Sequence, residues 1–102
     1  MEDQNDMQQQ IDDAIQQLIA AMQARFIERY PKNPPKVWSV KRGKKYLKIC
    51  DDGSVHAFVD ADGNMYKAAG WNAPAKGIRF NIIKDLPKLL KIADYAGGYL
   101  YR

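Results

Sequence analysis

The sequence predicts an α+β domain with an N-terminal helix, a four-stranded antiparallel β-meander, a structured loop and a C-terminal helix. Three observations lead to this fold class. Apolar residues recur with helical spacing over residues 3–30, four short β-prone runs separated by turns fill residues 36–68, and a second helical pattern covers residues 82–96. The 102 residues are expected to form a single domain, because two cores of half this size would each be too small to be stable.

The helix predicted over residues 3–30 has one apolar side. When its residues are spaced at 100° intervals, the large apolar side chains form a single stripe, and Gln, Asp and Arg occupy the opposite side. The stripe consists of Met7, Ile11, Ile15, Leu18, Ile19, Met22, Phe26 and Tyr30. Prolines at positions 31, 34 and 35 then end the helix, because proline lacks the N–H group that a helix interior needs.

The meander predicted over residues 36–68 consists of four runs rich in Val, Ile, Tyr and Phe. Xaa-Gly pairs at residues 42–43, 52–53 and 62–63 supply the hairpin turns between them. If these turns set the register, Trp38 pairs with Leu47. Leu47 then pairs with Phe58, and Phe58 pairs with Met65. The core face holds Trp38, Val40, Leu47, Ile49, His56, Phe58 and Met65. The mixed face holds Ser39, Lys41, Tyr46, Lys48, Cys50, Val55, Ala57, Val59, Tyr66 and Ala68, and a one-residue slip would exchange the two faces.

Residues 69–81 are predicted to form a shaped loop, because Gly70, Pro74 and Gly77 interrupt any regular pattern. The second helix is predicted over residues 82–96, with Asp85 as its N-cap and Pro87 in its first turn. Its apolar side consists of Ile82, Ile83, Leu86, Leu89, Leu90 and Ala93. Two glycines at residues 97–98 end this helix, and the tail over residues 97–102 either adds an edge strand or packs on the domain.

The net charge of +4 conceals an uneven distribution. Residues 1–30 carry six acids and two bases, whereas residues 31–102 carry fourteen bases and six acids. A basic body behind an acidic helix suits binding to a polyanion or to an acidic protein surface, and a solubilising surface is the alternative. No apolar run is long enough to span a membrane, and a single cysteine forms no internal disulfide, so we expect a reducing compartment.

No residue pattern indicates catalysis, and we expect neither an enzyme nor a cofactor, metal or small-molecule site. His56 is the only histidine; it falls on the predicted core face without a nucleophile beside it and is interpreted as a hydrogen-bonded core residue. Cys50 precedes two aspartates, which disfavour a thiolate. Residues 60–64 (DADGN) resemble the start of a calcium loop, but that motif needs Gly and Glu where this chain has Met65 and Trp71. These acids are interpreted as turn residues.

A cluster of basic and aromatic residues surrounds one predicted hairpin. Lysine and arginine neutralise phosphates, and exposed tyrosines stack on unpaired bases. The predicted nucleic-acid-binding residues are Lys41, Arg42, Lys44, Lys45, Tyr46, Lys48 and Tyr66, together with a basic stripe on the second helix formed by Lys84, Lys88 and Lys91. The alternative role of the hairpin lysines is to protect an exposed strand from aggregation.

A second cluster lies in and beside the predicted loop and has the composition of a protein-interaction hot spot. The predicted partner-binding residues are Lys67, Trp71, Lys76 and Arg79. We expect Lys76 and Arg79 to be exposed. For Trp71, a core position between the sheet and the second helix is favoured over a place in an interface.

Three segments resemble a family of small accessory proteins of tailed bacteriophages, cyanophages among them. They are residues 53–60 (GSVHAFVD), 63–79 (GNMYKAAGWNAPAKGIR) and 93–102 (ADYAGGYLYR), and the resemblance covers about residues 37–102. It implies a phage origin, a place in the host cell cytoplasm, and binding to a host enzyme such as an RNase or polymerase, with inhibition as the expected effect. A homodimer through an open sheet face or the first helix is a further possibility.

The order helix, strands, helix also resembles that of the double-stranded RNA-binding domain, in topology alone. The lysine-rich entry to the last helix of that fold is approximated here by Lys84, Lys88 and Lys91. The sequence therefore leaves three functional hypotheses. Modulation of a host protein is favoured, and direct binding of RNA or DNA is the alternative. A small hydrolase is the least favoured and would need a pocket with a perturbed acid or base.

Overall fold

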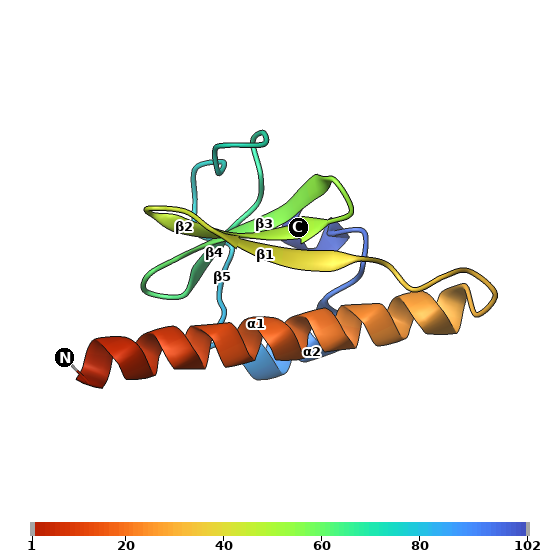
Figure 1. The fold of residues 1–102 in the computed structure, drawn as a ribbon, viewed down its shortest axis with the longest axis horizontal. Helices are drawn as coiled ribbons and strands as arrows, with labels where there is room; N and C mark the ends of the chain where they lie inside the picture. Colours follow the sequence, from red (N-terminus) through yellow and green to blue (C-terminus); the bar gives the residue numbers. More distant parts are fainter. Residues whose placement is uncertain (1, 102) are drawn as a thin grey trace.

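The computed structural model describes residues 2–101 and confirms the α+β fold class (Figure 1). It contains five strands where four were predicted, because residues inside the predicted loop pair with the fourth strand. In chain order the elements are α1 (Glu2–Arg29), β1 (Trp38–Arg42), β2 (Tyr46–Asp51), β3 (Ser54–Asp60), β4 (Asn64–Tyr66), β5 (Phe80–Asn81), α2 (Leu86–Ile92) and the 3-10 helix η1 (Gly98–Tyr101).

The five strands form one antiparallel sheet in the order β1-β2-β3-β4-β5. Each strand pairs with the strand that follows it in the sequence, as expected of a meander. Helices α1 and α2 lie together on one face of this sheet (Figure 1). The loop between β4 and β5 stands out on the opposite side, where no helix covers the sheet.

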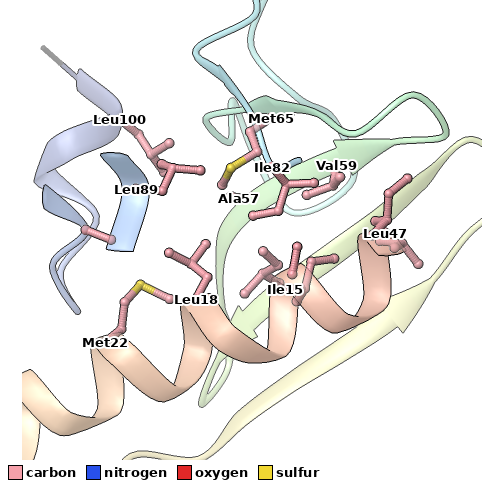
Figure 2. Packing of buried hydrophobic residues seen from close by; sticks show 14 of the residues in the cluster. Ile15, Leu18, Met22, Leu47, Ala57, Val59, Met65, Ile82, Leu89 and Leu100 are labelled. Atoms are coloured by element: carbon pink, nitrogen blue, oxygen red, sulfur yellow. The ribbon is translucent and has the colours of Figure 1, made fainter. Parts of the chain in front are cut away.

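The hydrophobic core fills the space between the sheet and the two helices (Figure 2). Every element except the edge strands contributes fully buried side chains, and each of these stabilises the fold by about 1.5–3 kcal/mol relative to exposure. The most deeply buried members include Ile15, Leu18 and Met22 of α1, Ile49, Ala57, Val59 and Met65 of the sheet, Leu89 of α2 and Leu100 of η1.

The long N-terminal helix follows the predicted apolar stripe closely. Ile11, Ile15, Leu18 and Met22 are buried, whereas Met7, near one end of the stripe, is 40% exposed. The helix ends at Arg29, just before the proline-rich connection. Within residues 2–101, no helix combines the length and the apolar character that crossing a membrane requires.

The predicted strand register is wrong, and the reason is a β-bulge. Cys50 pairs with Val55 and Ile49 pairs with Ala57, so His56 is an extra residue in β3. One extra residue exchanges the faces of all residues beyond it. Val59 therefore lies on the core face opposite Leu47, and Phe58 lies on the other face opposite Lys48 and Tyr66. The predicted faces of Ala57, Phe58 and Val59 are thus inverted.

The first hairpin also differs from the prediction, because its turn lies two residues later than expected. Trp38 pairs with Asp51 rather than with Leu47, and Leu47 pairs with Arg42. The Gly43 N–H donates to the Tyr46 carbonyl and closes the turn at 2.8 Å. A shift of two residues preserves side-chain alternation, so the predicted faces in β1 and β2 are still correct.

The C-terminal helix is shorter than the predicted 82–96, because Asn81 organises the residues before it. The Asn81 side-chain oxygen accepts hydrogen bonds from the N–H groups of Ile83 and Lys84, which form a turn after β5. Asp85 stands at the N-cap position of α2, but its carboxylate accepts from the Asn81 N–H and makes no side-chain cap bond. Ala93 is extended and ends the helix. The tail beyond it packs through Tyr99 and Leu100 and adds no strand.

Candidate functional site

The two basic-aromatic clusters predicted from the sequence meet at Trp71. Lys41 and Lys48 are direct cross-strand partners, and they alternate with the core residues of β1 and β2, so they lie on the face of the sheet away from the helices. The Lys48 Nζ lies 4.3 Å from the centroid of the Trp71 ring, and the Lys41 Nζ lies 5.0 Å from it. Lys48 Nζ also donates a hydrogen bond of 3.2 Å to Asn72 Oδ1. We call these four residues the Trp71 face.

Trp71 is 44% exposed, so the favoured expectation that it fills the gap between the sheet and the second helix is wrong. Trp71 belongs to the loop that connects β4 to β5, and this loop stands on the opposite side of the sheet from α2 (Figure 1). Its contacts with two ammonium groups are cation–π interactions, which attract a positive charge to the face of the ring. The ring is therefore placed by charged side chains and not by the core.

The charges on the Trp71 face are not neutralised by carboxylates. Within residues 2–101, the ion pairs of the structure join Lys36 to Asp51 and Arg42 to Asp12. Two like charges directly opposite each other on a sheet destabilise it. The Trp71 ring, which both ammonium groups contact, offsets part of that repulsion. An anion that bound both ammonium groups would remove the remaining repulsion between the two lysines.

Three aromatic side chains pack together on the same face of the sheet as Lys48. The Tyr46 ring packs edge-on against Phe58 and Tyr66, with centroids 5.8 and 5.9 Å away. The Tyr66 hydroxyl donates to Asp60 Oδ2 at 2.8 Å, and this bond raises the pKa of Tyr66 above its usual value. Both tyrosines are half-buried, and their rings are packed against each other. The predicted stacking platform of Tyr46 and Tyr66 is therefore only partly open.

The other predicted basic residues of the hairpin and the loop differ in exposure. Lys44, Lys45 and Lys76 are exposed. The Lys67 Nζ lies 4.8 Å from the ring centroid of Tyr101, an aromatic residue that the sequence analysis did not select and that is 61% exposed. Arg79 was expected to be exposed but is half-buried, with its Nε enclosed and without a hydrogen-bond partner.

Several predicted nucleic-acid-binding residues lie elsewhere on the molecule. The Arg42 side chain pairs with Asp12 of α1 at 3.2 Å and so lies on the helix side of the sheet. Lys84 precedes α2, and Lys88 and Lys91 belong to it, across the sheet from the loop that carries Trp71 (Figure 1). The predicted residues thus do not form one continuous surface, and the likeness to the double-stranded RNA-binding domain is one of element order.

The acidic turn between β3 and β4 is held by the chain's own donors. Asp60 Oδ1 accepts from the N–H groups of Asp62 and Asn64, and Asp60 Oδ2 accepts from the Tyr66 hydroxyl. Partial burial alone would raise the pKa of Asp60, but these hydrogen bonds together hold it below its usual value. In the part of the chain that the structure describes, no three His, Cys, Asp or Glu side chains gather as a metal site would require.

His56 is held among aromatic side chains. Its Nε2 lies 2.7 Å from the Tyr99 hydroxyl, and its ring packs edge-on against Trp38 with centroids 5.5 Å apart. Burial lowers the pKa of His56 to about 4 and also raises the pKa of Tyr99. The histidine is therefore neutral at pH 7. The expected hydrogen bond of His56 is confirmed, but the residue is half-buried at the edge of the core and not part of it.

A groove of about 570 Å³ runs between the first turns of α1 and the two nearby hairpin turns. Its apolar walls are Met7, Ile11, Leu47 and Val59. Its rim carries charges of both signs, including Lys44, Lys45 and Asp62. Asp60 also borders the groove, but its carboxylate oxygens are already hydrogen-bonded within the turn.

No curated protein and no solved structure matches the chain. One family model does match, and it spans residues 1–102. The chain therefore belongs to that family, which is described as a family of unknown function (DUF7717).

Proposed function

We propose that the protein is a non-catalytic nucleic-acid-binding protein and that the Trp71 face is its binding surface. The observation that carries this proposal is the convergence of the Lys41 and Lys48 ammonium groups on one half-exposed tryptophan ring, with no carboxylate partner among residues 2–101. Nucleic acids supply the two complementary groups together, a chain of phosphates for the lysines and aromatic bases for the ring.

The surroundings of the Trp71 face support an extended polyanion as the ligand. Lys44 and Lys45 continue the positive charge into the turn after β1, and Lys76 adds to it from the loop. Each phosphate contact releases condensed counterions, so the affinity must fall steeply as salt is added. A compact anion would contact fewer of these lysines and would show a weaker dependence on salt.

The test measures the affinity for a labelled single-stranded oligonucleotide at several salt concentrations between about 50 and 200 mM. The Lys41→Ala/Lys48→Ala variant should reduce the slope of log K against log salt by about 1.4, because each single-strand phosphate contact contributes about 0.7. The matched control is Lys88→Ala/Lys91→Ala, which removes the same charge from α2, on the other side of the sheet (Figure 1). Equal effects of the two variants would refute the assignment of the surface.

Binding to a host protein is the second candidate function, and two exposed apolar residues favour it. Trp71 is 44% exposed and Ile78, in the same loop, is 57% exposed. A tryptophan surrounded by polar groups is the commonest kind of interface hot spot. On this proposal, the protein is a phage accessory protein that inhibits a host enzyme in the host cell cytoplasm.

An affinity pull-down from infected host cells, with and without nuclease treatment, separates the two candidates. If the partner is a host enzyme, it is retained after nuclease treatment, and Trp71→Ala abolishes its retention. If nucleic acid is the ligand, all captured host proteins are lost on nuclease treatment. Lys91→Ala serves as the control variant, because Lys91 belongs to α2, across the sheet from the loop (Figure 1).

A further inference from the structure

We propose that Trp71 stacks on an unpaired base after phosphates have drawn Lys41 and Lys48 away from its ring, so that the ligand is a single-stranded rather than a duplex nucleic acid. This inference rests on the proposed function and adds the class of ligand. In the free protein, the two ammonium groups occupy the positions that phosphates and a base occupy in the complex.

The loop over residues 67–79 holds Trp71 in a fixed position without burying it. An isolated bridge pairs Ala68 with Pro74, and the Ala75 N–H donates to the Lys67 carbonyl at 2.8 Å. The Ala69 N–H donates to the Ala73 carbonyl at 3.0 Å and closes the smaller turn that carries Trp71. The backbone of this segment is therefore braced, and a ligand can approach the ring without unfolding the loop.

The contacts that hold the indole are of a kind that a phosphate can replace. Cation–π contacts at exposed sites are weak, whereas charge-assisted bonds between an ammonium group and a phosphate are among the stronger polar contacts. Lys41 is exposed and Lys48 is half-buried, so both long side chains can turn toward an incoming phosphate. Their departure frees the face of the ring over which they now lie.

An exposed ring face distinguishes single strands from duplexes. Bases in a duplex are stacked on their neighbours and offer no free face, whereas single-strand-binding proteins gain much of their affinity from aromatic stacking. Duplexes would still bind to the lysines through their phosphates. The inference therefore predicts that both ligands respond to salt but that only the single strand depends on Trp71.

The experiment compares four probes: an oligouridylate and an oligothymidylate of roughly 12 nucleotides, a duplex of the same length and inorganic polyphosphate. Trp71→Ala should weaken binding of both single strands about tenfold and leave binding of the duplex and of polyphosphate unchanged. Trp71→Phe, which keeps a stacking ring, should restore most of the lost affinity. Tyr101→Ala removes a different exposed aromatic residue and is the matched control.

Fluorescence provides a second measurement on the intact chain. In a Trp38→Phe variant all tryptophan emission comes from Trp71, because the sequence contains two tryptophans. Single strands should quench this emission, and polyphosphate should not. Equal weakening of single strands and polyphosphate by Trp71→Ala would overturn the stacking inference and leave the proposed function intact. If neither single strands nor the duplex bind with a salt-dependent affinity, the proposed function fails as well.

Discussion

His56 should make the stability of this protein depend on pH in a narrow window. The histidine is half-buried, its Nε2 lies 2.7 Å from the Tyr99 hydroxyl, and desolvation lowers its pKa from 6.5 to about 4. Asp51 and Asp94 oppose this shift by attracting a positive charge, and Lys36 adds to it. The unfolded chain therefore binds a proton near pH 6.5, whereas the folded chain stays unprotonated until pH is near 4.

The sign and the size of the effect follow from these two values. Above pH 6.5 neither state carries the proton, so the contribution of the neutral histidine to stability is complete. As pH falls from 6.5 to 4, only the unfolded state gains the proton, and the free energy of unfolding decreases by about 3 kcal/mol in total, since one pKa unit corresponds to about 1.4 kcal/mol. Below pH 4 this contribution does not decrease further.

Urea denaturation of the wild type and of His56→Gln between about pH 7.5 and 4 measures this contribution. Glutamine can still accept a hydrogen bond from Tyr99 but does not titrate. The variant should therefore lose much less stability across the window than the wild type. The pKa of Asp60 is below its usual value of 3.8, so protonation of Asp60 affects stability only below the pH range of this experiment. Parallel curves for the two proteins would show that His56 is not the titrating group.

Three further substitutions test the core, a partly buried ion pair and the backbone. Leu89→Ala removes a fully buried side chain between α2 and the sheet and should cost about 2–5 kcal/mol of unfolding free energy in urea. Lys36→Met leaves the Asp51 carboxylate, now paired at 2.8 Å, without its cation, and should cost about 1–3 kcal/mol by the same assay. Gly97→Ala introduces a Cβ at a φ of +85°, 3.4 Å from His56 Cε1, and should lower the thermal midpoint through a strain of about 1–2 kcal/mol. An unchanged midpoint for Gly97→Ala would contradict the close packing of the tail against His56.

The first helix could be predicted from the sequence because its signals are local. The apolar stripe repeats over about seven turns of regular spacing, and prolines follow it directly. The order of the strands was also predictable, since hairpins connect neighbours along the chain. Interactions between residues close in sequence thus determine these parts of the fold.

The inverted faces in β3 could not be predicted from hydrophobic patterning. His56 is accommodated as an extra residue because its ring packs against Trp38 and binds Tyr99, which lies 43 residues further along the chain. Both Phe58 and Val59 are apolar, so either could belong to the core, and only the bulge decides between them. Similarly, Asn81 ends the loop through side-chain bonds that a helical pattern over residues 82–96 does not reveal.

The components of the candidate site were predictable, but their arrangement was not. Lys48 and Trp71 lie in separate clusters of the sequence. The path of the loop across the sheet brings the Trp71 ring centroid to 4.3 Å from the Lys48 Nζ. Lys91 has the same charge as Lys41, yet it belongs to α2, which lies across the sheet from the loop that carries Trp71 (Figure 1). Composition identifies basic and aromatic residues, whereas the sheet and the loop determine which of them share a surface.

The central claim is that single-stranded nucleic acid binds at the Trp71 face, and an NMR titration of the isotope-labelled protein tests it most directly. Addition of an oligouridylate should shift the Trp71 indole N–H signal and the amide signals of Lys41 and Lys48. The amide signals of Lys88 and Lys91 in α2 should remain unchanged. Shifts that gather on α2, while the Trp71 indole signal stays in place, would contradict the claim.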